Sequence, residues 1–240
     1  MKRLATICAR AGSKSVQKKN LRVLAGRPLI AWTVLQAKAS AMFDKIVVSS
    51  DDEAILAAAI DAGADDAIDR PAALATDTAA KVPAIYHALV ETERRCSIQF
   101  DILVDLDATA PLRLAQDITG AVSLLEKSHA TSIITGAPAH RSPYFNLVER
   151  QGDGSVQLSK PPASTVVRRQ DAPPCFDMNA SIYVWRRDAF LLDPRVFYPD
   201  TRLYEMPSER SHDIDSELDF TVVEFLFIHL GIADALHVGS

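Results

Sequence analysis

The sequence has few cysteines, and their spacing suits neither a metal site nor a disulfide framework. Its 240 residues include three cysteines, Cys8, Cys96 and Cys175, an odd number at irregular positions. This usage is typical of reduced thiols in the cytoplasm, where we expect the protein to reside. Cys8 lies in an apolar segment and is expected to behave as a small hydrophobic residue.

Long hydrophobic runs and an excess of positive charge are also missing. No stretch reaches the roughly 18 apolar residues of a membrane span, and the cations near the N-terminus precede no apolar run long enough for a secretory signal. The net charge of −5, from 26 Lys and Arg against 31 Asp and Glu, argues against general binding to nucleic acid or to anionic membranes. Any anionic ligand must therefore meet a local basic site.

What is present is an alternation of short apolar runs with helical patterns. It predicts βαβ units and an α/β fold with a mainly parallel sheet flanked by helices. The expected strands are 3–9, 45–50, 65–68, 102–106, 131–135 and 180–186. The expected helices are 28–41, 52–62, 82–95 and 115–127, followed by a core helix at 218–236. The 240 residues are expected to form one domain.

The segment 139–178 has a different texture, because prolines surround short alternating stretches. Within it, Gln151-Gly152-Asp153-Gly154 predicts a hairpin turn between strands at 144–150 and 155–159. The segment lacks a core of its own. We therefore expect a β-rich excursion that packs on another subunit.

The loop at 10–20 places glycine and positive charge directly behind the first expected strand. Gly12 permits close approach of the backbone to a ligand. The cations of the loop are Arg10, Lys14, Lys18 and Lys19. Ligands of open α/β sheets bind at the carboxyl ends of strands, so the position favours a polyphosphate site over a solvated basic loop.

An acidic motif, Asp213-Ile214-Asp215, precedes the last expected helix. In an extended segment the two carboxylates point to the same side, which suits a hard cation such as Mg²⁺ or Mn²⁺. The alternative is helix capping, with Asp215 as the N-cap and Glu217 in the first turn. Capping accounts for one of the two carboxylates and not for both.

Weaker signals leave alternatives open. Asp105 and Asp107 end the strand at 102–106, where they would either contact a ligand or accept amides of the following turn. The pair Arg168 and Arg169, with Gln170 nearby, suits a carboxylate or phosphate but is equally typical of a solvated surface. The six histidines show no metal-ligand spacing, and among them His212 adjoins a candidate site.

Three motifs, in this order and spacing, resemble those of the N-acylneuraminate cytidylyltransferase family, also called CMP-sialic acid synthetases. Residues 7–14 with Lys19-Asn20 are similar to the family's I-P-A-R-x-G-S-K-x-x-x-x-K-N. Residues 74–78 (Leu-Ala-Thr-Asp-Thr) resemble L-A-x-D-T, and residues 214–220 (Ile-Asp-Ser-Glu-Leu-Asp-Phe) resemble I-D-T-E-L-D-F. The resemblance covers nearly the whole chain.

The resemblance implies a Rossmann-like nucleotidyltransferase fold, a homodimer built on the β excursion, and CTP with Mg²⁺. It implies that the anomeric hydroxyl of a nine-carbon α-keto sugar acid attacks the α-phosphorus of CTP, which gives a CMP-sugar and pyrophosphate. It assigns CTP to Arg10, Gly12, Ser13, Lys14, Lys19, Asn20 and Thr76, with Arg10 and Lys19 also catalytic. It assigns the metal to the catalytic pair Asp213 and Asp215. It assigns the sugar to Asp107, Arg169, Gln170, Tyr183 and Phe197, with Arg169 reaching across the dimer.

Departures from the family pattern concern the sugar. Asp107 stands where sialic acid enzymes commonly have the glutamine of L-Q-P-T-S-P-L-R, and Cys8 stands where they have proline. Residues 142–146 and 177–181 are more similar to the branch that activates bacterial nonulosonates such as legionaminic acid. The resemblance therefore specifies the nucleotide better than the acceptor.

Rival functions remain at this point. One is cytidylyl transfer to 3-deoxy-manno-octulosonate, against which the match at 214–220 speaks. Another is a non-catalytic nucleotide-binding module of the same fold, for which a broken loop or metal pair would be expected. A glycosyltransferase that uses Asp105 and Asp107 for its metal is less favoured, and an oxidoreductase fits poorly because the first loop lacks G-x-G-x-x-G.

Overall fold

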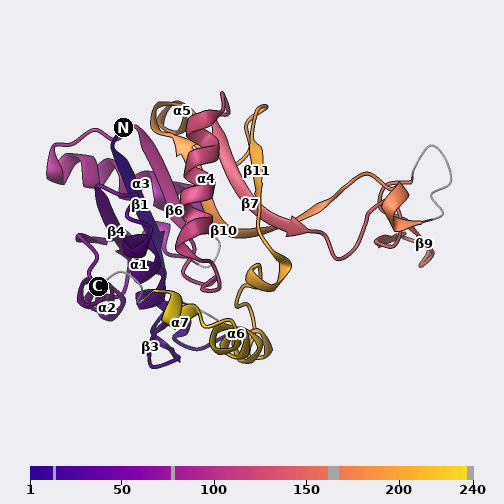
Figure 1. Cartoon of the computed structure of the whole chain (residues 1–240), viewed down its shortest axis with the longest axis horizontal. Coiled ribbons are helices and arrows are strands. Elements are labelled where there is room, and N and C mark those ends of the chain that lie inside the picture. The colour runs from indigo at the N-terminus through magenta and orange to yellow at the C-terminus, as the bar shows by residue number, and fades with distance from the viewer. Residues whose placement is uncertain (13–14, 77–78, 162–167, 237–240) are drawn as a thin grey trace.

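A seven-stranded sheet forms the centre of the molecule (Figure 1), in a computed structural model that describes residues 1–12, 15–76, 79–161 and 168–236. Its strands are β1 (Arg3–Cys8), β4 (Lys45–Ser50), β5 (Asp66–Asp69), β6 (Ile102–Leu106), β7 (Ser132–Pro138), β10 (Phe176–Arg186) and β11 (Arg202–Glu205). They are arranged in the order β11-β7-β10-β6-β1-β4-β5. Strands β6, β1, β4 and β5 are parallel, β10 is antiparallel to both neighbours, and β11 is parallel to β7. The predicted fold class is confirmed.

Helices cover both faces of this sheet. They are α1 (Leu29–Ala39), α2 (Glu53–Asp61), α3 (Lys81–Cys96), α4 (Ala115–Lys127), α5 (Arg187–Leu192), α6 (Glu217–His229) and α7 (Ile232–Ala235). Helices α1, α2 and α4 share one core cluster, and α3 and α5 share the other. Because neighbouring residues of β1 point to opposite faces, Ala5 joins the first cluster and Leu4 the second. A strand buried on both faces is apolar throughout, which is why the sequence predicted it.

Short elements complete the chain. A small hairpin pairs β2 (Val23–Leu24) with β3 (Arg27–Pro28), and Gly26 in its turn has a φ of +85°. Single 3-10 turns lie at η1 (Lys19–Leu21), η2 (Ala72–Leu74), η3 (Arg169–Asp171) and η4 (Ser208–Arg210).

The C-terminal helical region differs from the single core helix expected at 218–236. Gly231, with a φ of +61°, separates α6 from α7. Helix α6 buries Phe220 and Phe227 on one face, but Leu218 and Phe225 on the other are 72% and 63% exposed. The expectation of a core helix is therefore wrong for the outer face of α6. Within the described ranges, no helix has the length and apolar character needed to cross a bilayer.

An arm projects from the body between β7 and β10 (Figure 1). It carries the predicted hairpin, in which β8 (Val148–Arg150) pairs antiparallel with β9 (Val156–Leu158). Gly154 in the turn has a φ of +87°, a conformation that glycine adopts without strain. The apolar side chains of Val148 and Val156 are 53% and 63% exposed. Packing of this arm on another subunit stays a prediction.

Candidate active site

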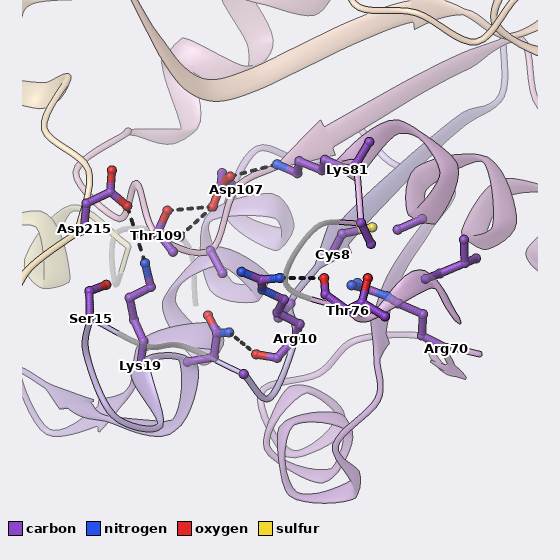
Figure 2. Close-up of a pocket in the computed structure, with 18 residues that line it drawn as sticks. Cys8, Arg10, Ser15, Lys19, Arg70, Thr76, Lys81, Asp107, Thr109 and Asp215 are labelled. Atoms are coloured by element: carbon purple, nitrogen blue, oxygen red, sulfur yellow. Dashed lines mark hydrogen bonds and ion pairs between the residues drawn. The ribbon is translucent and has the colours of Figure 1, made fainter. Parts of the chain in front are cut away.

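The candidate site is a cleft of about 500 Å³ over the carboxyl ends of β1 and β6. It brings together predicted residues from four distant parts of the chain: Arg10, Gly12, Lys19, Asn20, Thr76, Asp107 and Asp215. Figure 2 labels five of them, Arg10, Lys19, Thr76, Asp107 and Asp215. Cys8, Arg70 and Lys81 also line it. This is the edge of a parallel sheet where ligands of open α/β folds bind.

Hydrogen bonds hold the loop after β1 in shape. Arg10 Nη1 donates to the backbone carbonyl of Thr76 at 2.7 Å, which joins the first and second sequence motifs. Asn20 Nδ2 donates to the carbonyl of Arg10 at 3.0 Å. Val16 is fully buried in the cluster that also contains Ile214. The predicted CTP residues Ser13 and Lys14 lie outside the described residues.

Asn20 carries an unsatisfied acceptor. The residue is 7% exposed, and its Oδ1 has no hydrogen-bond partner within the described part of the chain. A buried acceptor without a donor costs about 1–3 kcal/mol, so it suits a group that a ligand completes. Asn20 lines the cleft, where a hydroxyl or amino group of a ligand would supply the donor.

The acidic motif contacts two segments that border the cleft, the turn after β6 and the loop after β1. The amide of Ile214 donates to the carbonyl of Thr109 at 2.9 Å. Lys19 Nζ donates to the carbonyl of Ile214 at 2.5 Å and lies 3.7 Å from Asp215 Oδ1. The N-cap of α6 is Ser216, whose hydroxyl accepts from the amide of Asp219. The capping alternative for Asp215 is therefore wrong.

Of the predicted cation pair, Asp215 lines the cleft and Asp213 is not among its lining residues. Burial, and then the negative charge of Asp215, raise the pKa of Asp213 above its ordinary value. A divalent cation between the two carboxylates would relieve that repulsion. Among the described residues no group of three possible His, Cys, Asp or Glu ligands occurs. A pair fits Mg²⁺, which commonly takes one or two carboxylates and completes its shell with water and substrate phosphates.

Asp105 and Asp107 converge on Lys81, the first residue of α3. Lys81 Nζ lies 2.7 Å from Asp105 Oδ2 and 2.8 Å from Asp107 Oδ2. Asp107 Oδ1 also accepts from the amide and the hydroxyl of Thr109, at 2.8 Å each. Burial alone would raise the pKa of Asp107, but the charge of Lys81 and these donors hold it well below its ordinary value. Asp107 thus accepts a turn amide and also lines the cleft.

A buried arginine supports this turn from below. Arg113 is fully buried, and its guanidinium donates to the backbone carbonyls of Asp107 and Ser181 and to the side chains of Thr33 and Gln36. Burial lowers its pKa to about 10, so it remains charged at neutral pH. Arg113 fixes the backbone of the residue whose carboxylate holds Lys81.

Sequence reasoning missed two cations of the cleft. Arg70 is 6% exposed and donates to the carbonyl of Ser49 at 2.6 Å. Its signal was a cation two residues after the expected strand 65–68, close to the kind of position that identified Arg10. Lys81 had a weaker signal, because its role depends on two carboxylates from another strand. Burial, and then the charge of Asp105, raise the pKa of Cys8, so this thiol stays protonated as expected of a small hydrophobic residue.

The predicted sugar residues are only partly brought together. Tyr183 faces Asp105 across β10 and β6, and its ring centre lies 5.4 Å from Lys81 Nζ. Phe197 is 59% exposed and does not line the cleft. Gln170 lines a separate hollow at the base of the arm. Arg169 lies in η3 on the arm, and its side chain is outside the described set.

Other candidate groups have structural roles. Asn179 is buried, where its Oδ1 accepts from Thr135 Oγ1 at 2.7 Å and its Nδ2 donates to Ser211 Oγ at 2.9 Å. These contacts give Asn179 a structural role within the fold. Arg168 forms an ion pair with Asp171 on the arm, at 3.0 Å. Asp52 caps α2 through the amide of Ala54.

Comparisons with known proteins agree with this geometry. A family model described as "Cytidylyltransferase" matches residues 4–226. "Post-translational flagellin modification protein B" of Campylobacter coli is 46% identical over 93% of this chain and 94% of that protein. "CMP-N,N'-diacetyllegionaminic acid synthase" of Campylobacter jejuni subsp. jejuni serotype O:2 is 44% identical with the same coverage. A solved CMP:2-keto-3-deoxy-manno-octonic acid synthetase complexed with CTP is 18% identical, with a TM-score of 0.69 over 96% of this chain and all of that one, which shows the shared fold.

Proposed function

This chain belongs to the cytidylyltransferase family, and we propose that it transfers CMP from CTP to the anomeric hydroxyl of a nonulosonic acid of the legionaminic or sialic type, with release of pyrophosphate. It is a nucleotidyltransferase enzyme. The observation that carries the proposal is the meeting of Arg10, Lys19, Asn20 and Asp215 in one cleft at the carboxyl edge of the sheet.

The nucleotide is held by the loop after β1. Arg10 and Lys19 supply positive charge for the triphosphate, and Gly12 allows the backbone to approach it. Asn20 Oδ1 offers its unsatisfied acceptor to a hydroxyl or amino group of the cytidine. No covalent enzyme intermediate is needed, because alignment of the attacking oxygen with the α-phosphorus and neutralisation of phosphate charge account for most catalysis of this kind.

Asp213 and Asp215 would hold a divalent cation, Mg²⁺ or Mn²⁺. When bound, such an ion neutralises phosphate charge and lowers the pKa of an attacking hydroxyl. Lys19, 3.7 Å from Asp215 Oδ1, places the triphosphate grip beside the carboxylate pair. In this proposal the bound triphosphate has its α-phosphate next to the site where the attacking hydroxyl of the sugar binds.

The acceptor is assigned to the legionaminic and sialic class because of the relatives. The relative at 44% identity is named for N,N'-diacetyllegionaminic acid, and one from Campylobacter jejuni at 28% is named for pseudaminic acid. Asp107 and Tyr183 lie at the cleft or next to it. Arg169 and Gln170 lie on the arm, so they would reach the sugar only in a homodimer whose arms are exchanged. We place the reaction in the cytoplasm, which suits the three unpaired cysteines.

Transfer to an eight-carbon acid is disfavoured, because the likeness to the octonic acid synthetase is limited to 18% identity. A non-catalytic module is disfavoured because the sequence keeps both the basic loop and Asp213-Ile214-Asp215, and Asp215 lines the cleft. The test is pyrophosphate release from CTP with a panel of N,N'-diacetyllegionaminic, pseudaminic, N-acetylneuraminic and 3-deoxy-manno-octulosonic acids. We expect turnover with at least one nine-carbon acid. Folded protein that binds CTP but turns over none of them would favour the non-catalytic module.

A further inference from the structure

Lys81 is a cation of the cleft to which the proposed mechanism gives no part. It is the first residue of α3, where the positive end of the helix dipole disfavours a cation. Two carboxylates hold it there, since its Nζ lies 2.7 Å from Asp105 Oδ2 and 2.8 Å from Asp107 Oδ2. The Lys81 side chain remains 32% exposed and lines the cleft. The ammonium is thus charged, fixed in place and accessible to a ligand.

The donors of this ammonium can be counted. A lysine ammonium carries three N–H donors and no acceptor. Within the described ranges it donates one hydrogen bond, to Asp107 Oδ2, and it forms an ion pair with Asp105 Oδ2 at 2.7 Å. The ring of Tyr183 lies beside it with its centre 5.4 Å from Nζ. Asp105 is itself held by Thr6, whose hydroxyl donates to Oδ1 at 2.9 Å. At least one donor therefore remains for a ligand, and the contacts with Asp105 and Asp107 fix the position of the ammonium.

The local charge determines which acceptor suits that donor. Lys81 faces two carboxylates, and the buried guanidinium of Arg113 also acts on both of them, so the cluster has no net charge. A phosphate or carboxylate that approached Lys81 would therefore gain little net attraction. Lys19 differs, because the Asp215 carboxylate beside it is 3.7 Å from Nζ and 79% exposed.

We propose that Lys81 is a substrate-binding residue that donates one N–H to a neutral oxygen of a substrate, a sugar hydroxyl or a carbonyl. Arg10 and Lys19, and not Lys81, bind the triphosphate. Asp105 and Asp107 are positioning residues that aim the donor and cancel its attraction for phosphate. The inference rests on the proposed function, in which the acceptor sugar and the cytosine are the two sources of such an oxygen.

The test compares Lys81→Met/Asp105→Asn with Asp105→Asn alone. The double variant removes the ammonium and one carboxylate, so the net charge of the cluster is unchanged. For each we would measure KM for CTP, KM for the sugar, inhibition by inorganic tripolyphosphate, and Tm. A hydrogen bond from a charged donor is worth about tenfold or more in affinity. We expect the double variant to raise one KM by that factor relative to both Asp105→Asn and wild type, with tripolyphosphate inhibition unchanged from wild type, whose net charge in the cluster it keeps.

The two sources give different results. A higher KM for the sugar at saturating CTP assigns the oxygen to the acceptor, whereas a higher KM for CTP with tripolyphosphate inhibition unchanged assigns it to cytosine. Partial recovery in Lys81→Arg would support a donor role. Tenfold weaker inhibition by tripolyphosphate would overturn the proposal, as would a lower Tm with both KM values unchanged. Failure of the proposed function can be told apart from failure of the Lys81 proposal, because wild-type protein would then release no pyrophosphate. In that case the binding of CTP, sugars and tripolyphosphate to the same variants, measured by calorimetry, would test Lys81.

Discussion

Lys19 Nζ lies 3.7 Å from Asp215 Oδ1, and this contact joins the basic loop near one end of the chain to the acidic motif near the other. The same ammonium donates to the carbonyl of Ile214 at 2.5 Å. One side chain thus fixes the distance between the expected triphosphate grip and the expected cation pair. The basic loop and the acidic motif, which lie far apart in the sequence, therefore belong to one site.

Removal of the Lys19 charge is expected to lower the catalytic efficiency of the enzyme with CTP. Lys19→Met should lower kcat/KM for CTP by about 100-fold, because a positioned charge on a transferring phosphate is worth about 3 kcal/mol in the transition state. Steady-state pyrophosphate release measures this. The matched control is Lys127→Met, an exposed lysine in the last turn of α4, which should change kcat/KM less than twofold. Equal effects of the two substitutions would contradict the role of Lys19.

Asp215→Asn tests the cation pair. The substitution removes one of the two negative charges, so we expect turnover to fall about 100-fold at fixed Mg²⁺ and the Mg²⁺ concentration for half-maximal activity to rise. The control is Asp61→Asn, an exposed residue at the end of α2. Titration of activity with Mg²⁺ and Mn²⁺ provides the measurement. If the metal dependence of Asp215→Asn matched that of wild type, Asp215 would lose its assigned role.

Arg113 is expected to be needed for stability. Arg113→Met leaves the carbonyls of Asp107 and Ser181 without their buried donor, so the free energy of unfolding should fall by about 3–5 kcal/mol. Urea unfolding measures the change. Arg94→Met removes an exposed ion pair with Glu91 and should leave the midpoint of urea unfolding nearly unchanged. A loss at Arg113 no larger than the loss at Arg94 would show that the buried contacts are not what stabilises the turn.

The exposed apolar hairpin of the arm predicts a homodimer in solution. Val156→Asp places a charge on the face that the second copy should cover, so light scattering should show a shift from twice the mass of the chain to a single copy. Turnover should fall when the dimer dissociates, because Arg169 and Gln170 would no longer reach the partner's cleft. Leu192→Asp is the control, since Leu192 on the body is 88% exposed. Wild-type protein that is monomeric and fully active would contradict the prediction.

The sequence allowed the central strands and their helices to be placed to within a few residues, because β1, β4 and β6 are buried on both faces and consist mainly of apolar residues. It did not allow β11 to be found. That strand, Arg-Leu-Tyr-Glu, is at the edge of the sheet and pairs only with β7 among the described strands, so its pattern is short and half polar. For helix α6 the sequence predicted too much burial, because apolar residues such as Phe225 remain exposed on its outer face.

The candidate site shows the same division. Arg10 and Asp215 could be predicted because each lies in a continuous motif. Lys81 could not, because its environment exists only after α3 packs beside β6 and brings Asp105 and Asp107 to it. Long-range electrostatic contacts of this kind leave no periodicity in the sequence.

Transfer of the CMP group itself is the central claim, and doubly labelled CTP tests it most directly. The protein is incubated with Mg²⁺, a nine-carbon nonulosonic acid and CTP that carries one label on the α-phosphate and another on the γ-phosphate. We predict that the α-label appears in a CMP-sugar and the γ-label in pyrophosphate, in equal amounts. Appearance of the γ-label as inorganic phosphate, or absence of the α-label from any sugar product while CTP is bound, would contradict the account.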